Sequence, residues 1–167
     1  MPPGFESLPL RFLLFLVLCF SSLSGRAHAL EVQSPAGFFT VVEEMGERWG
    51  PVLYEKKDFG AIEAEVGRLL QQVPDDQASL DLEWLYFALA TVPKENAAID
   101  QRKAVLEEWC AASPNSHVPW LVKGRFLINY GWMIRTSRWA QEVPEGSWKP
   151  FHDQLQLARE ALEKSRK

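Results

Sequence analysis

Residues 80–92, "LDLEWLYFALATV", decide the fold class of this 167-residue chain. On a helical projection, apolar side chains surround the axis almost completely, at Leu82, Trp84, Leu85, Phe87 and Leu89. A helix that is apolar on every side is usually buried among several neighbours. We therefore expect a central helix here, capped at its start by Asp76 or Ser79, with amphipathic helices packed around it.

Two segments before this stretch have the single apolar face of an amphipathic helix. In the first, apolar residues recur at steps of three and four over residues 38–49, and Gly50 and Pro51 are expected to end the helix. The second is expected to begin after Asp58, a good N-cap, and to stop at Pro74. Each helix needs a partner that covers its apolar face.

Helical patterns also fill the chain after Pro93. One segment ends at Pro114, a second covers residues 119–143, and a third starts near Ser147 with its apolar residues on one face. No segment shows the alternation that is expected of a strand. The sequence predicts an all-α fold, in which antiparallel helical hairpins stack as a short tetratricopeptide-like solenoid.

A spacing of 40 residues supports the solenoid, because the periods of helical repeats lie in this range. When Pro74 is aligned with Pro114, the turns that follow the two prolines coincide. The apolar positions that coincide are Val66 with Leu106, Leu69 with Trp109, and Leu70 with Cys110. Trp120 and Gly124 also have the spacing of the first signature positions of a tetratricopeptide repeat.

The first 29 residues have the order of a signal peptide. Arg11 precedes an apolar run over residues 12–20, and small and polar residues follow as far as "RAHAL". The run is shorter than the roughly 20 residues that span a bilayer, so we expect cleavage between Ala29 and Leu30, with an uncleaved anchor as the alternative. The predicted organisation is a signal peptide over 1–29 and a single domain over 30–167, exported to the periplasm or secreted and without a membrane segment after cleavage.

The composition disfavours several partners and cofactors. The formal net charge is −4 and basic runs are absent, which fits nucleic acid poorly because phosphate binding needs clustered Lys and Arg. Cys19 falls within the predicted signal peptide, so Cys110 would remain without an intramolecular disulfide partner. His117 and His152 lack the spacing of metal ligands. We expect no metal and no cofactor.

Catalysis is not indicated either, and we assign no catalytic residue. Cys110 is expected to be a packed side chain rather than a nucleophile for His117. Paired acidic residues, such as Glu63 with Glu65, lie on hydrophilic faces or in turns and are interpreted as solvated charge. The seven tryptophans are interpreted mainly as core aromatics, because nearly all lie on the apolar stripe of a predicted helix.

The region from Leu106 to Leu162 resembles a bacterial family that is described only as a domain of unknown function, with a tetratricopeptide-like architecture. The resemblance is carried by "LEEWCAASPNS", "NYGWMIRTSRWAQEV" and "WKPFHDQLQLAREAL". The middle block is similar to the family pattern Y-A-W-x-A-R-G-x-x-Y-A-x-x-V, matched by Tyr130, Trp132, Arg135, Ala140 and Val143. Gly131, Ile134, Thr136 and Trp139 depart from it. The resemblance implies a helical fold and no particular reaction.

The candidate binding residues lie in this block. On a continuous helix, Trp132, Arg135 and Trp139 share one face, so Arg135 could lie between two indoles and pair with Glu142. The alternative is a structural clamp that locks this helix to the last one through Trp148 and Phe151.

A second set of candidates mixes polar atoms into the same broad side of the helix. Arg125, Asn129 and Thr136 could line a groove for a peptide or glycan, and the alternative is that they satisfy loop carbonyls. Gly124 and Gly131, seven residues apart, would let a neighbouring helix come close.

Two functions fit these observations. The first is an exported, non-catalytic repeat protein that binds another protein or peptide in a concave groove, with Arg125, Asn129, Trp132, Arg135 and Trp139 as the lining. The second is a cell-wall or glycan-associated binding domain or enzyme that uses a Trp-rich groove, with a perturbed acidic residue beside exposed tryptophan. The oligomeric state is not predicted.

Overall fold

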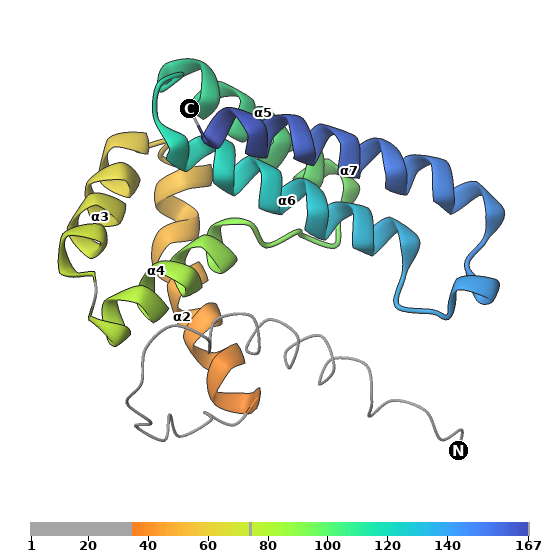
Figure 1. The fold of residues 1–167 in the computed structure, drawn as a ribbon, viewed down its shortest axis with the longest axis horizontal. Coiled ribbons are helices and arrows are strands. Elements are labelled where there is room, and N and C mark those ends of the chain that lie inside the picture. Colours follow the sequence, from red (N-terminus) through yellow and green to blue (C-terminus); the bar gives the residue numbers. More distant parts are fainter. Residues whose placement is uncertain (1–34, 74, 167) are drawn as a thin grey trace. The chain divides into compact units, whose positions relative to one another are not determined.

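The computed structural model describes residues 35–73 and 75–166, which form six α-helices and one short 3₁₀ helix joined by turns and loops (Figure 1). They are α2 (Pro35–Tyr54), α3 (Phe59–Gln72), α4 (Asp76–Leu89), α5 (Asn96–Ala112), α6 (His117–Arg135), η1 (Ala140–Glu142) and α7 (Glu145–Ser165). These residues contain no strand, so the predicted all-α, repeat-like fold is confirmed. The predicted signal peptide lies outside the described residues.

Three helices begin at side chains that accept a hydrogen bond from the first turn. Asp58 accepts from the Ala61 amide at 3.0 Å and caps α3, as predicted. Asp75 accepts from the Ala78 amide at 3.0 Å and caps α4, one residue before the nearer of the two predicted caps. Ser116 caps α6 in the same way. Each cap satisfies an amide that the helix itself leaves unpaired.

The first helix, α2, is longer than the sequence indicates. It continues through Gly50 and Pro51 to Tyr54, although a proline inside a helix removes one backbone hydrogen bond. The added turn buries Leu53 completely and Tyr54 almost completely. We attribute the continuation to these contacts, which outweigh the local cost of the proline.

The central position predicted for residues 80–92 is confirmed. Helix α4 packs against α2, α3 and α6, and its buried side chains include Trp84, Leu85 and Leu89. Because other helices cover α4 on several sides, apolar side chains can occur all around its axis.

The C-terminal end of α4 receives donors from three other helices. The Tyr54 hydroxyl of α2 donates to the Leu89 carbonyl. Asn129 Nδ2 of α6 donates to the Ala90 carbonyl at 3.0 Å, and the Arg102 guanidinium of α5 donates to the Thr91 carbonyl. The last carbonyls of a helix have no partner within the helix and carry its partial negative charge. Side chains from α2, α5 and α6 therefore meet at one point.

Helices α3 and α5 are joined through Trp109, which is completely buried. Its ring stacks on Phe59 with 5.7 Å between centroids, and its indole N–H donates to Glu63 at 2.9 Å. The interpretation of Glu63 as solvated charge was therefore wrong, because this carboxylate satisfies a core indole.

The predicted 40-residue correspondence holds at the buried positions of α3 and α5. Val66 and Leu69 are buried, as are Leu106 and Trp109. The third pair differs, because Leu70 is exposed whereas Cys110 is buried.

Helices α6 and α7 lie side by side and run antiparallel (Figure 1). A Cβ atom built on Gly124 would lie 2.7 Å from Leu162, and one on Gly131 would lie 3.4 Å from Phe151. The two glycines thus let the helices come close, as the sequence predicted.

We expect Tyr54→Phe to lower the free energy of unfolding by about 1–3 kcal/mol, because the buried Leu89 carbonyl loses its donor. Chemical denaturation monitored by circular dichroism measures the change. Tyr86→Phe is the matched control, since Tyr86 is buried to the same degree and its hydroxyl has no hydrogen-bond partner among the described residues. Equal losses in the two variants would contradict the capping role of Tyr54.

Candidate functional site

A cation lies between two indole rings where α6 ends and α7 begins. The Arg135 guanidinium carbon is 5.0 Å from the ring centre of Trp132 and 5.2 Å from that of Trp148. The Phe151 ring contacts both indoles edge-on, and its centroid lies 5.3 Å from that of Trp132 and 6.3 Å from that of Trp148. We call these four residues the Arg135 cluster.

The predicted sandwich therefore has a different second indole. Helix α6 ends at Arg135 rather than near Val143, so Trp139 does not share its face. Trp139 instead precedes η1 and is 65% exposed. Trp148 of α7 takes its place, which is the geometry of the structural clamp that the sequence analysis gave as the alternative.

Glu142 is also displaced by the end of the helix. It is exposed in η1 and shares no helical face with Arg135. The Arg135 guanidinium donates to the Thr136 carbonyl at 3.3 Å. No ion pair between Arg135 and a carboxylate is formed within the described residues.

Thr136 ends α6 in a strained backbone conformation. Its φ is 69° and its ψ is 168°, a region that is essentially restricted to glycine and costs other residues of order 1–3 kcal/mol. Its hydroxyl oxygen is buried and has no hydrogen-bond partner in the described part of the chain. Glycine occupies this position in the family pattern, which is the residue that the conformation favours.

Two of the candidate residues, Arg125 and Asn129, support the scaffold. Arg125 packs its guanidinium on the Phe87 ring, 3.3 Å from the centroid, and burial lowers its pKa. Asn129 holds the Ala90 carbonyl of the α4 terminus. Both side chains therefore bind α4, and the polar groove predicted along α6 is not formed by them.

Tryptophan and methionine side chains are exposed at the end of α6 and in the segment that follows it in the chain. Trp132 is 39% exposed and Met133 is 40% exposed, in the last turn of α6. With Trp139 they account for three of the six large apolar side chains that are exposed in the described residues. The interpretation of the tryptophans as core aromatics was therefore wrong for Trp132 and Trp139. We call Trp132, Met133 and Trp139 the exposed patch.

Among the described residues, the thiol and the imidazoles come from three different helices. Cys110 is buried in α5, and burial raises its thiol pKa to about 11, so its nucleophilic thiolate form is scarce near neutral pH. His117 begins α6 and His152 lies in α7, so the two imidazoles come from different helices. Within the described residues, no group of His, Cys, Asp and Glu could hold a metal ion.

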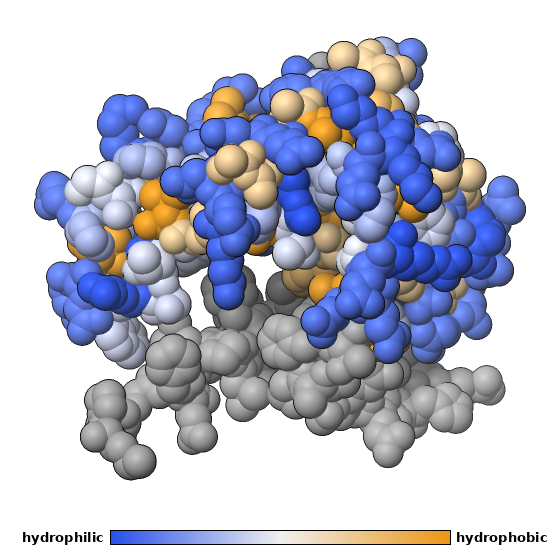
Figure 2. Space-filling view, turned by 180° about the vertical axis from the view of Figure 1, so that it is seen from behind, coloured by the Kyte–Doolittle hydropathy of each residue, from blue (hydrophilic) through white to orange (hydrophobic). Residues whose placement is uncertain are grey.

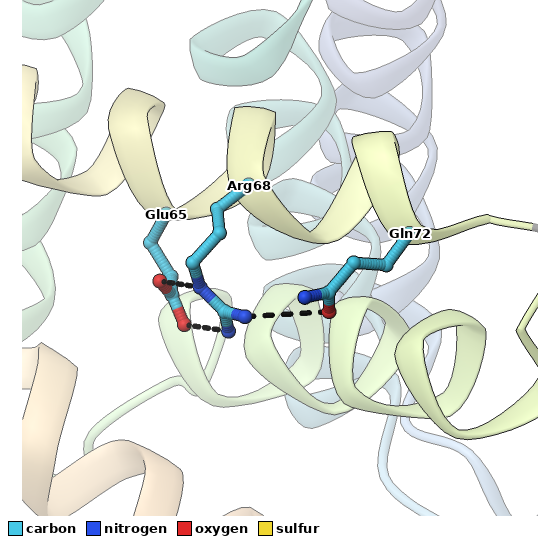
Figure 3. Close-up of polar contacts among 3 residues, drawn as sticks. All are labelled: Glu65, Arg68 and Gln72. Carbon is cyan, nitrogen blue, oxygen red and sulfur yellow. Dashed lines mark hydrogen bonds and ion pairs between the residues drawn. The ribbon is translucent and has the colours of Figure 1, made fainter.

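The acidic residues of α3 have structural partners, and Figure 3 shows that of Glu65. Arg68 donates to both carboxylate oxygens of Glu65, at 2.7 and 2.8 Å, and also to Gln72 at 3.3 Å. The hydrogen bonds from Arg68 hold the pKa of Glu65 below its usual range. Glu63 and Glu65 therefore both hold neighbouring side chains of the scaffold.

One concave site was not anticipated from the sequence. Side chains of α5, α6 and α7 line a cavity of about 170 Å³ that is partly open to solvent, with a lysine from each helix on its wall: Lys103, Lys123 and Lys164. The three lysines are far apart in the chain and belong to no motif, so only the packing of the three helices brings them together.

None of the described helices is both long and apolar enough to cross a bilayer. On the face of the molecule in Figure 2, hydrophilic residues predominate and hydrophobic residues occur in small separate areas.

Residues 51–153 match the model of the protein family described as a domain of unknown function, DUF4034. The match begins well before Leu106, where the motif resemblance starts, and so includes the α4 helix. No curated protein and no solved structure matches the chain.

We expect Thr136→Gly to raise the free energy of unfolding by about 1 kcal/mol, since relief of strain of order 1–3 kcal/mol exceeds the roughly 0.5–1 kcal/mol lost to glycine flexibility. Chemical denaturation measures the gain. Thr136→Ala removes the buried hydroxyl but keeps Cβ, so its gain should be smaller. A lower stability for the glycine variant would show that the conformation is not strained.

Proposed function

The chain belongs to the DUF4034 family, and we propose that it is an exported, non-catalytic module that binds an apolar segment of another protein at the end of α6. The exposed patch is the single observation that carries this proposal. A tryptophan as exposed as Trp139 is unusual on a protein surface, because large aromatic side chains are mostly buried in cores or interfaces.

The Arg135 cluster gives this patch a rigid base. Arg135 and Phe151 fix the Trp132 ring from two sides, so a partner would meet a preformed aromatic surface. Binding to a preformed surface loses less conformational entropy than binding to mobile side chains. Aromatic anchors with such support are the residues that most often carry the affinity of an interface.

The position of the patch differs from the concave groove expected along α6. Arg125 and Asn129 are occupied by α4, so we assign binding to Trp132, Met133 and Trp139, with Arg135 as the residue that holds Trp132. Glu142 is exposed nearby in sequence and would offer a polar rim.

We expect Trp139→Ala to abolish retention of a specific partner while leaving the unfolding transition unchanged, since Trp139 is mostly exposed. The measurement is affinity capture from a periplasmic extract on the immobilised protein, followed by direct titration of the identified protein. Leu70→Ala is the control, because it truncates an exposed apolar side chain on α3 instead. Retention that Trp139→Ala leaves intact, or retention of glycan in place of protein, would contradict the proposal.

Export is tested separately. We expect the full chain, expressed in a Gram-negative host, to accumulate in the periplasm as a protein whose N-terminal residue is Leu30, because the A-x-A pattern ends at Ala29. N-terminal sequencing and intact mass of the periplasmic fraction measure this. Replacing Ala27 and Ala29 with bulky residues should block cleavage. A full-length cytoplasmic product would refute export.

A further inference from the structure

The cavity between α5, α6 and α7 has the size of a small organic ligand. Its volume is about 170 Å³, and a cavity of about 150 Å³ in another protein holds benzene. None of the residues of the exposed patch lines it. An inference about this cavity is therefore independent of the proposed function.

One part of the wall is apolar. Leu106, Phe126 and Leu127 contribute buried surface, and Leu157 of α7 is 47% exposed at the same cavity. Such an exposed leucine in a concavity favours an apolar group that would cover it. Helices α6 and α7 come close where Gly124 contacts Leu162. Helix α5 forms the third side of the cavity.

A second part of the wall carries positive charge that lacks a counterion. Lys123 pairs with Glu107 at 2.6 Å. The ammonium of Lys103 instead lies 4.0 Å from the Tyr130 ring centre, and that of Lys164 lies 4.3 Å from the Trp120 ring centre. Neither has a carboxylate within ion-pair distance among the described residues. Two such ammonium groups favour an anionic ligand.

The wall also contains two acids, Glu107 and Glu160. Glu107 is paired with Lys123, so Glu160 is the one that would oppose an anion. Glu160 lines the cavity and accepts a hydrogen bond from Gln156 at 3.0 Å. Like charges at short range are unfavourable, so this side chain provides a direct test of the sign of the ligand's charge.

A buried acceptor on the wall lacks a donor. Gln154 Oε1 is buried and has no hydrogen-bond partner in the described part of the chain. A buried unsatisfied acceptor is costly, and a ligand N–H would satisfy it. The ligand is therefore expected to carry an N–H donor as well as an anionic group and an apolar part.

We propose that this cavity binds an apolar amino acid whose nitrogen is acylated. Its carboxylate binds Lys103 and Lys164, its amide N–H donates to Gln154 Oε1, and its side chain packs on Leu127 and Leu157. This chemistry is shared by a free N-acyl amino acid and by the last residue of a peptide.

Calorimetric titration of the full chain with N-acetyl-leucine tests the proposal, with N-acetyl-leucinamide as the uncharged comparison. We expect saturable binding of the acid and at least about tenfold weaker binding of the amide, because one charge-assisted hydrogen bond contributes about that factor. Absence of binding by the acid to protein that is folded by circular dichroism would overturn the proposal.

Three variants test the assigned charges. Lys164→Met should weaken N-acetyl-leucine binding about tenfold, and Glu160→Gln should strengthen it by removing like charge. Lys149→Met is the matched control, since it makes the same charge change on α7 at an exposed ion pair outside the cavity, and its affinity should equal wild type. Weaker binding by Glu160→Gln, or equal losses in the two lysine variants, would overturn the assignment.

The hydrogen-bond donor and the source of the ligand are tested last. The wild type should prefer N-acetyl-leucine over 4-methylpentanoate, which lacks the N–H, and Gln154→Leu should lose this preference. A preference that persists in the variant would overturn the role of Gln154.

Tighter binding of the peptide Gly-Gly-Leu than of N-acetyl-leucine would identify a peptide terminus as the source of the ligand. The reverse order would identify a free N-acyl amino acid.

Discussion

The arrangement of the helices depends on how the C-terminal end of α4 is satisfied. This central helix ends at Leu89 and Ala90, which are completely buried, so their carbonyls need donors within the protein. Tyr54 of α2 and Asn129 of α6 supply these donors, and Arg102 of α5 donates to the exposed Thr91 carbonyl that follows. A shift of any of these helices would break a hydrogen bond at a shared point, so the same interactions that satisfy α4 also fix the positions of its neighbours.

This constraint decides which residues of α6 are available for binding. The half of α6 that faces α4 uses Arg125 and Asn129 to hold that helix. The end of α6 beyond them contacts α7, through Trp132 and Phe151, and its remaining surface is exposed. A binding face can therefore form at the end of α6 without disturbing the core.

The pairing of α6 with α7 supports two surfaces of different chemistry. At one end, Arg135 between Trp132 and Trp148 orders aromatic side chains that are partly exposed. Elsewhere along the pair, with α5 as the third wall, lysines and leucines line a small cavity. The proposed protein-binding residues lie at the aromatic end, whereas the lysines proposed to bind an anion lie at the cavity.

The sequence by itself determined the helices, the Asp58 cap of α3, the central position of α4 and the close approach at Gly124, because periodicity, caps and small residues act locally. The tertiary structure decided where α2 and α6 end. Burial of Leu53 and Tyr54 carries α2 past Pro51, and the conformation of Thr136 ends α6 before Trp139. It also chose Trp148 as the partner of Arg135 and assembled the lysine cavity, because side chains from separate helices meet only through packing, which no local pattern encodes.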